Sequence, residues 1–241
     1  MGRHGTIAGR KAAQDSKRAA MFTKYARAII VAAKAGGNPE YNSSLRLAID
    51  KARAISMPND KIQRAIKKGT GELEGESYVE QSYEGYGPGG VAIIVEALTD
   101  NTNRSTSSIR SAFDKHGGNL GTPGCVSYMF ARKGVIVIEK TDDIDEDALM
   151  EAALEAGADD FVTEEDCFII YTEPSAHTDV HTAIVEAGYE PVESDINFVP
   201  SMEATPGEHD ITKLRKLIDV LEDNDDVQKV HTNCAIDLYE E

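Results

Sequence analysis

The amino-acid sequence predicts an α+β protein, with an N-terminal three-helix bundle followed by two ferredoxin-like α+β domains. Three observations lead to this fold class. Over about the first seventy residues, apolar positions recur at three- and four-residue steps, which is the helical period. Beyond residue 77 the pattern changes to alternation and short apolar runs, which indicate strands. There, strands and helices alternate in units that each suit two helices on a small antiparallel sheet.

Three short helices are expected before residue 77. Asn42, Ser43 and Ser44 are the candidate caps for the second helix, because their side chains can accept a hydrogen bond from the first turn. Pro58 suits the first turn of the third helix, and Gly36 and Gly69 suit the ends of the first and third. Each helix has one apolar stripe, so the three should pack as a bundle. Their expected ranges are residues 12–35, 43–55 and 58–69.

Strands and helices alternate along the rest of the chain, after a glycine-rich linker. The last helix and strand lack partners of their own, and one closure that the pattern allows returns them to the unit that starts at residue 78. The expected domains are then residues 1–77, residues 78–133 with 201–241, and the inserted residues 134–200. Strands are expected over 78–83, 91–98, 126–130, 135–139, 161–163, 168–171, 193–199 and 227–234, and helices over 101–116, 145–156, 178–187 and 210–221.

The charge is divided very unevenly along the 241 residues. The whole chain has a net charge of −17. Residues 1–71 contain 15 Lys and Arg against 4 Asp and Glu, whereas residues 72–241 contain 10 against 38. A basic segment joined to an acidic body is typical of polyanion-binding proteins. The alternative is a basic helical surface that is merely solvated.

The cations of the first segment are the candidate nucleic-acid-binding residues. On the first helix, Lys24, Arg27 and Lys34 fall opposite the apolar stripe, so reversing their charge should weaken polyanion binding and leave the helices folded. Tyr25 and Tyr41 could stack on bases or belong to the core or its rim. Cations neutralise phosphates without specifying bases. The full candidate set is Arg10, Lys11, Lys17, Arg18, Lys24, Arg27, Lys34, Arg46, Lys51, Arg53, Lys61, Arg64, Lys67 and Lys68.

A glycine-rich segment, GYGPGG at residues 85–90, formally matches a dinucleotide-binding motif. Such a site needs a helix to follow the glycines, because the helix N-terminus binds the pyrophosphate. Here the apolar run VAIIVEAL follows, which predicts a strand. The segment is therefore interpreted as a hairpin turn, and no cofactor is expected.

The sequence offers no catalytic or metal-binding constellation. His177 and His181 could share a helix face, but two histidines do not make a zinc site. The acidic run over 142–147 lacks the spacing of a calcium loop and suits a helix start. Three dispersed cysteines fit a reducing cytoplasm, and Cys125 and Cys167, which lie beside strand residues, are expected to be buried thiols. No signal peptide or membrane span is recognisable, so a cytoplasmic protein without membrane contact is expected. Because no catalytic constellation is found, the protein is expected to be non-enzymatic.

A family resemblance rests on four long blocks: RKAAQDSKRAAMFTKYAR, LRLAIDKARAISMPNDKIQRAIKKGTGEL, YEGYGPGGVAIIVEALTDNTNR and GGNLGTPGCVSYMF. They closely resemble the YebC family of probable transcriptional regulators, and the likeness runs from about residue 10 to the end. The first nine residues depart from the family. Its members usually start with Gly-His-Ser-Lys-Trp, whereas this chain starts MGRHGTIAG, so no contact is carried over to that segment.

The resemblance implies a cytoplasmic protein of three domains, the third inserted into the second. It implies a DNA-binding transcriptional regulator. Relatives also act on translation, including mitochondrial translational activators and bacterial factors that relieve ribosomes stalled at proline-rich stretches. A ribosome-associated factor that binds ribosomal RNA is therefore the alternative, since a positive surface alone does not separate duplex DNA from RNA. A third hypothesis, an enzyme or small-molecule sensor, has a possible fold but no chemistry in the sequence.

Overall fold

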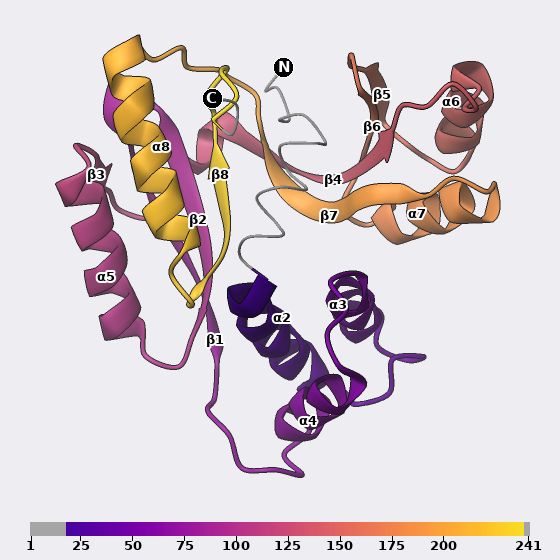
Figure 1. Ribbon diagram of the computed structural model, residues 1–241, viewed down its shortest axis with the longest axis horizontal. Coiled ribbons are helices and arrows are strands. Elements are labelled where there is room, and N and C mark those ends of the chain that lie inside the picture. The colour runs from indigo at the N-terminus through magenta and orange to yellow at the C-terminus, as the bar shows by residue number, and fades with distance from the viewer. Residues whose placement is uncertain (1–17, 239–241) are drawn as a thin grey trace. The chain divides into compact units, whose positions relative to one another are not determined.

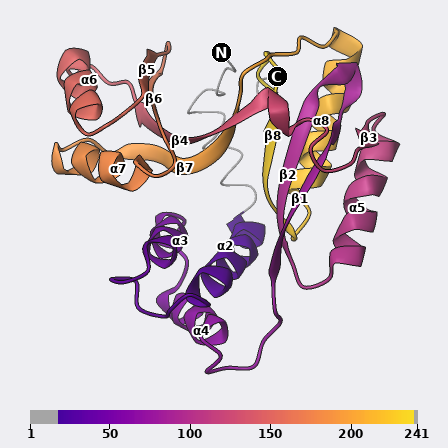
Figure 2. The same cartoon turned by 180° about the vertical axis from the view of Figure 1, so that it is seen from behind.

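The computed structural model describes residues 18–238, with side chains from residue 21 onward, and it has the predicted α+β class (Figures 1 and 2). The described chain forms two units, which we treat separately. One contains the chain up to Val126 together with Pro206–Thr232, and the other contains Ser127–Thr205 and the residues from Asn233 onward. Among the described helices, none combines the length and the apolar character that crossing a membrane requires.

Three helices open the first unit: α2 (Arg18–Ala33), α3 (Ser43–Ala54) and α4 (Asn59–Gly69). They enclose a core that includes the fully buried Ile29, Leu45 and Ile62. Of the three candidate caps, Asn42 is the one that caps α3, because its Oδ1 accepts a hydrogen bond of 3.0 Å from the Leu45 N–H. The predicted three-helix bundle is therefore confirmed.

The first sheet has the strand order β3-β1-β2-β8, with all neighbours antiparallel. Helices α5 and α8 contact each other and pack against this sheet (Figures 1 and 2). The late strand β8 pairs with β2, so the last helix and strand do return to the first sheet. The elements are β1 (Val79–Tyr86), β2 (Ala92–Thr99), α5 (Thr102–Lys115), β3 (Asn119–Leu120), α8 (Glu208–Glu222) and β8 (Val227–Thr232).

The GYGPGG segment joins β1 to β2 as a tight hairpin, as predicted. The Gly87 N–H donates to the Val91 carbonyl at 2.7 Å, and Pro88–Gly90 makes a 3₁₀ turn between them. Gly89 and Gly90 have φ values of 71° and 73°, which glycine adopts without strain. The element that directly follows this turn is the strand β2 and not a helix, so the dinucleotide-binding interpretation is excluded by its own structural requirement.

The second unit holds a second antiparallel sheet, in the order β5-β6-β4-β7. Its two helices cover one face, where Leu149 and Val180 pack with Ile136, Phe168 and other buried strand residues. The elements are β4 (Phe130–Glu139), α6 (Glu146–Glu155), β5 (Asp160–Thr163), β6 (Cys167–Thr172), α7 (His177–Glu186) and β7 (Pro191–Pro200).

Two details of the expected strands are wrong. Residues 126–130 were expected to be a strand separate from 135–139, but Ser127–Met129 is a 3₁₀ turn and β4 runs unbroken from Phe130. The polar Ala131–Gly134 stretch stays in the sheet because β7 pairs with β4 from Pro200 to Pro191. A short strand also forms at Asn119–Leu120, between the ranges expected for the helix over 101–116 and the strand over 126–130.

Candidate nucleic-acid interface

The structure separates the predicted cations by their surroundings. Arg10, Lys11 and Lys17 lie outside the described residues, and Arg18 begins α2 with its side chain outside the described part. Of the other ten, nine lie on the three helices of the bundle and Lys34 directly follows α2. They form two groups, one that contacts the rest of the first unit and one that faces outward.

The cations of α2 and the adjacent Lys34, together called the α2 cations, form the first group, because they bond to the chain around the first sheet. The Lys24 ammonium donates to the Glu222 carbonyl at 2.5 Å, and the Lys34 ammonium donates to the Tyr78 carbonyl at 2.6 Å. Arg27 donates to the carbonyls of Leu98, at 3.4 Å, and Asp225. The sequence placed these cations opposite the apolar stripe, but it does not show that this face meets another part of the chain.

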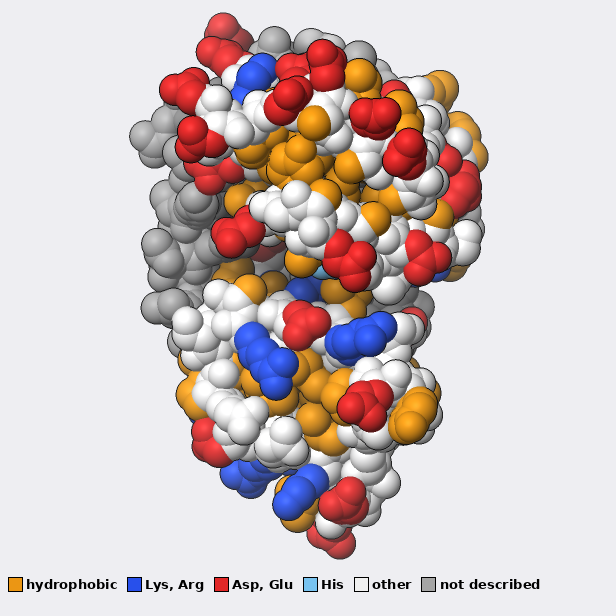
Figure 3. All heavy atoms as spheres, turned by 90° about the vertical axis from the view of Figure 1, so that its right-hand side faces the viewer, with side chains coloured by type: hydrophobic (Ala, Val, Ile, Leu, Met, Phe, Trp, Pro, Cys, Tyr) orange, Lys and Arg blue, Asp and Glu red, His pale blue; other side chains and the backbone are white. Residues whose placement is uncertain are grey.

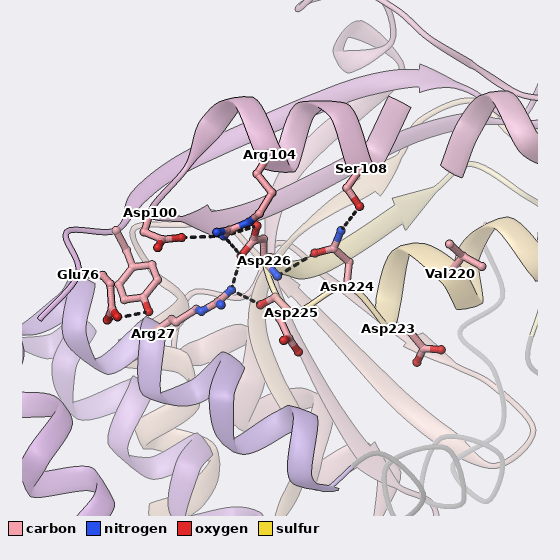
Figure 4. Close-up of a pocket in the computed structure, with 11 residues that line it drawn as sticks. Arg27, Glu76, Asp100, Arg104, Ser108, Val220, Asp223, Asn224, Asp225 and Asp226 are labelled. Carbon is pink, nitrogen blue, oxygen red and sulfur yellow. Dashed lines mark hydrogen bonds and ion pairs between the residues drawn. The ribbon is translucent and has the colours of Figure 1, made fainter. Parts of the chain in front are cut away.

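Arg27 also belongs to a buried cluster around Asp226 (Figure 4). Its Nη1 lies 2.7 Å from Asp226 Oδ1, and the two side chains are 12% and 4% exposed. Arg104, which is half exposed, places Nη2 at 3.0 Å from Asp226 Oδ2 and 2.7 Å from Asp100 Oδ1. The Ser105 hydroxyl donates to Asp226 Oδ2 at 2.6 Å. One carboxylate therefore collects donors from the bundle and from α5.

The electrostatics of this cluster favour the ionised carboxylate. Burial alone raises the pKa of Asp226, but hydrogen bonds from Ser105 and Arg104 and the charges of Arg27 and Arg104 outweigh it, so the pKa is lowered. The hydrogen bond from Arg104 likewise lowers the pKa of Asp100 and is the main cause of the raised pKa of Arg104. The arrangement suits a structural ion pair between the bundle and the first sheet.

Sequence reasoning missed this cluster. The only usable signal was Asn101, whose side chain caps α5 through the Arg104 N–H at 3.1 Å and so sets Arg104 and Ser105 in the first turn. Asp226 follows other acidic residues in the segment EDNDD. Nothing in that run distinguishes the one buried carboxylate from its solvated neighbours.

The outward-facing cations belong to α3 and α4. Some have local partners: Arg53 lies 3.6 Å from Asp50 and Lys68 lies 3.8 Å from Glu76, both partly in solvent. Lys51 is partly buried. In Figure 3 blue side chains stand on this three-helix part, whereas red acidic side chains dominate the part built by the second sheet and its helices. The exposed members are Arg46, Arg53, Lys61, Arg64 and Lys67.

A groove of about 430 Å³ lies between α2 and α4. Phe22, Ala26 and Ile30 of α2 line it with apolar surface, and cations of α4 line it opposite. The Lys61 ammonium lies 5.1 Å from the centre of the Phe22 ring, within the range of a cation–π contact. The α4 cations in the lining are Lys61, Arg64 and Lys68, and the other lining residues are Thr23, Arg27, Met57, Ala65 and Tyr78.

The two tyrosines for which base stacking and a core or rim position were both open differ in exposure. Tyr41 is 88% exposed, whereas Tyr25 packs partly buried against the bundle core. Of the two histidines, His177 is buried, with Nε2 3.0 Å from the Ser194 hydroxyl. Cys167 is buried as expected, whereas Cys125 is only partly buried.

The comparisons with known proteins decide the family. Residues 3–72 match the family model described as the TACO1/YebC protein N-terminal domain. Residues 78–234 match the model of the TACO1/YebC second and third domain. The chain belongs to the TACO1/YebC family. The resemblance found in the sequence is thus confirmed.

Relatives within the TACO1/YebC family are similar over nearly their whole length. A protein of Clostridioides difficile (strain 630), named a probable transcriptional regulatory protein, is 52% identical over 98% of this chain and all of its own. One of Clostridium novyi (strain NT), with the same description, is 53% identical over 95% of this chain and 93% of its own. The crystal structure of a conserved hypothetical protein from Aquifex aeolicus matches with a TM-score of 0.83, at 46% identity over 91% of each chain.

Proposed function

We propose that this TACO1/YebC protein is a non-enzymatic regulator of gene expression that acts in the cytoplasm and binds nucleic acid through the exposed cations of α3 and α4. The observation that carries the proposal is the concentration of outward-facing cations on these two helices. The names of the relatives support regulation of transcription as the role.

Phosphate binding is the interaction that such a surface favours. Arg46, Arg64 and Lys67 are exposed, so each can approach a phosphate without first breaking a buried contact. Cations spread over two helices gain affinity mainly by releasing counterions from the nucleic acid. The acidic remainder of the chain repels phosphates, which restricts productive approach to the bundle.

The α2 cations have a different proposed role. Lys24, Arg27 and Lys34 already donate to atoms of the same unit, so a phosphate would have to compete with those bonds. We assign them first to holding the bundle against the first sheet. Their contribution to nucleic-acid binding is then indirect, through the orientation of α3 and α4.

A second candidate function is that of a ribosome-associated translation factor that contacts ribosomal RNA. The resemblance described above favours it, because relatives include mitochondrial translational activators. The family model that matches this chain is likewise described by both names, TACO1 and YebC. The exposed cations serve either target, because they meet a phosphate backbone that DNA and RNA share. The choice therefore depends on which nucleic acid the protein contacts in the cell.

The cationic surface is tested by charge reversal. The triple variant R46E/R64E/K67E should bind a duplex DNA fragment at least tenfold more weakly at 0.1 M salt, measured by fluorescence anisotropy. If the three cations contact phosphates, the slope of log K against log salt should become shallower by about 2.7.

A matched control has the same change of charge elsewhere in the first unit. The variant R110E/K213E/K216E alters exposed cations of α5 and α8, and it should retain the wild-type slope. Equal losses in both triple variants would show that only net charge matters and would overturn the proposed surface. Crosslinking in living cells, followed by sequencing, then separates promoter DNA from ribosomal RNA.

A further inference from the structure

We propose that the groove between α2 and α4 binds one unpaired nucleotide, with its base against the apolar wall of α2 and its phosphates among the cations of α4. This inference rests on the proposed function and deepens it, because it names a form of nucleic acid that the exposed cations alone do not select. The groove has a volume of about 430 Å³, within the size range of small-ligand sites.

The cationic wall follows from the helical period. Lys61, Arg64 and Lys68 are spaced by three and four residues, so they share one face of α4 and all line the groove. Arg64 is exposed. Lys68 lies 3.8 Å from Glu76 of the linker, and this ion pair is partly in solvent. Such a row offers charge to successive phosphates of one strand.

The apolar wall supplies a surface for a base. Phe22 is partly buried against the bundle core and also lines the groove, so its ring is both supported and accessible. The Lys61 ammonium lies over this ring at 5.1 Å, and the Arg27 guanidinium lies over the Tyr78 ring at 5.2 Å. A π surface beside cations matches the two halves of a nucleotide, since bases stack on aromatic rings and phosphates pair with cations.

The alternative forms of polyanion fit the groove less well. A duplex keeps its base faces stacked inside the helix, so it could use the cations but not the Phe22 ring. An acidic amphipathic helix needs a groove with an extended apolar floor, whereas the α4 wall of this groove is lined mainly by Lys61, Arg64 and Lys68. The outward cations Arg46 and Lys67 on the same bundle suit a strand that continues beyond the groove.

The test removes the ring and keeps the apolar volume. Phe22→Leu should lower affinity for a single-stranded 12-nucleotide RNA about tenfold, and affinity for a duplex of the same sequence should stay within twofold. Tyr128→Leu is the matched control, because it removes an exposed tyrosine ring outside both the groove and the bundle. It should change neither affinity. Circular dichroism should show wild-type helix content in both variants.

A second arm locates the base itself. A series of 12-mers, each with one abasic position, should include positions where the wild type binds about tenfold more weakly and Phe22→Leu shows no further loss. Equal losses of affinity for single strands and duplexes in Phe22→Leu would overturn the inference. It would also be overturned if a poly-glutamate peptide competed with the single strand and Phe22→Leu lowered the affinity for this peptide as much as the affinity for the RNA. If duplex binding still depends on Arg46, Arg64 and Lys67 in these cases, the proposed function is retained and only the groove inference is wrong. If the protein binds no nucleic acid even at low salt, the proposed function and the groove inference are both wrong.

Discussion

At the scale of single residues, Asp226 is a buried carboxylate of the first unit that is held by several donors. Its carboxylate is 4% exposed and receives charged donors from Arg27 and Arg104. Taking such a pair out of water costs much of what its attraction contributes, so the pair is a weak source of net stability. Removing one partner is different, because the other charge is left buried without compensation.

Asp226→Ala should therefore destabilise the protein strongly. We expect a loss of about 3 kcal/mol in the free energy of unfolding, because Arg27 is only 12% exposed and loses its carboxylate. Urea denaturation followed by circular dichroism measures the loss. Asp225→Ala is the control: this exposed neighbour contacts Arg27 through its backbone carbonyl, which the substitution retains, so the expected change is below about 0.5 kcal/mol. A similar small change for both variants would contradict the buried-pair interpretation.

The same carboxylate predicts a direction for the pH dependence of stability. The pKa of Asp226 is lower in the folded protein than its ordinary value of 3.8. The ionised group then contributes stability above that value, and this contribution is lost as pH falls through the folded pKa. Between pH 6 and a pH below the folded pKa, the wild type should lose more stability than Asp226→Asn, as measured by urea titrations at each pH. Parallel pH profiles for the two proteins would count against this assignment.

At the scale of elements, most helices and strands could be predicted because their apolar periods reflect burial directly. The caps Asn42 and Asn101 start α3 and α5 where the sequence placed these helices. The error at β4 has a physical cause, since a strand can include polar residues wherever a long partner such as β7 supplies its hydrogen bonds. Periodicity reports which residues are buried, and it does not report the length of a partner strand.

The approach of α4 to α2 gives an element-scale prediction. A Cβ added at Gly69 would lie 2.4 Å from the Ile30 carbonyl oxygen and 2.5 Å from Ala33 Cβ, so Gly69→Ala must push the two helices apart. We expect a loss of about 1–3 kcal/mol in unfolding free energy. Gly75→Ala is the comparison, because its new methyl would meet only the flexible Lys68 side chain, at 3.1 Å. Its unfolding midpoint in urea should stay near that of the wild type, and equal midpoints for all three proteins would refute the close packing.

At the scale of the whole molecule, the sequence shows how charge is divided along the chain, but it does not show which charged side chains face solvent. Counting residues shows a basic segment and an acidic remainder, but not that Lys24, Arg27 and Lys34 bond within the first unit. Those bonds depend on tertiary packing, which has no local signature in the sequence. The candidate groove was also beyond prediction, because Phe22 and Lys61 meet only when α2 packs against α4.

The acidic remainder should influence how fast nucleic acid binds. Residues 134–200 contain 19 Asp and Glu and a single Lys, so this segment repels phosphates over distances set by the Debye length, about 10 Å at 0.1 M salt. Neutralising four exposed carboxylates with D142N, D143N, E151Q and E155Q should raise the association rate with duplex DNA a few-fold at low salt, as measured by stopped-flow fluorescence. The increase should disappear near 0.5 M salt, because screening then removes the repulsion in wild type and variant alike. An increase that persisted at high salt would point to a changed contact, and no increase at low salt would mean that the acidic segment does not govern approach to the bundle.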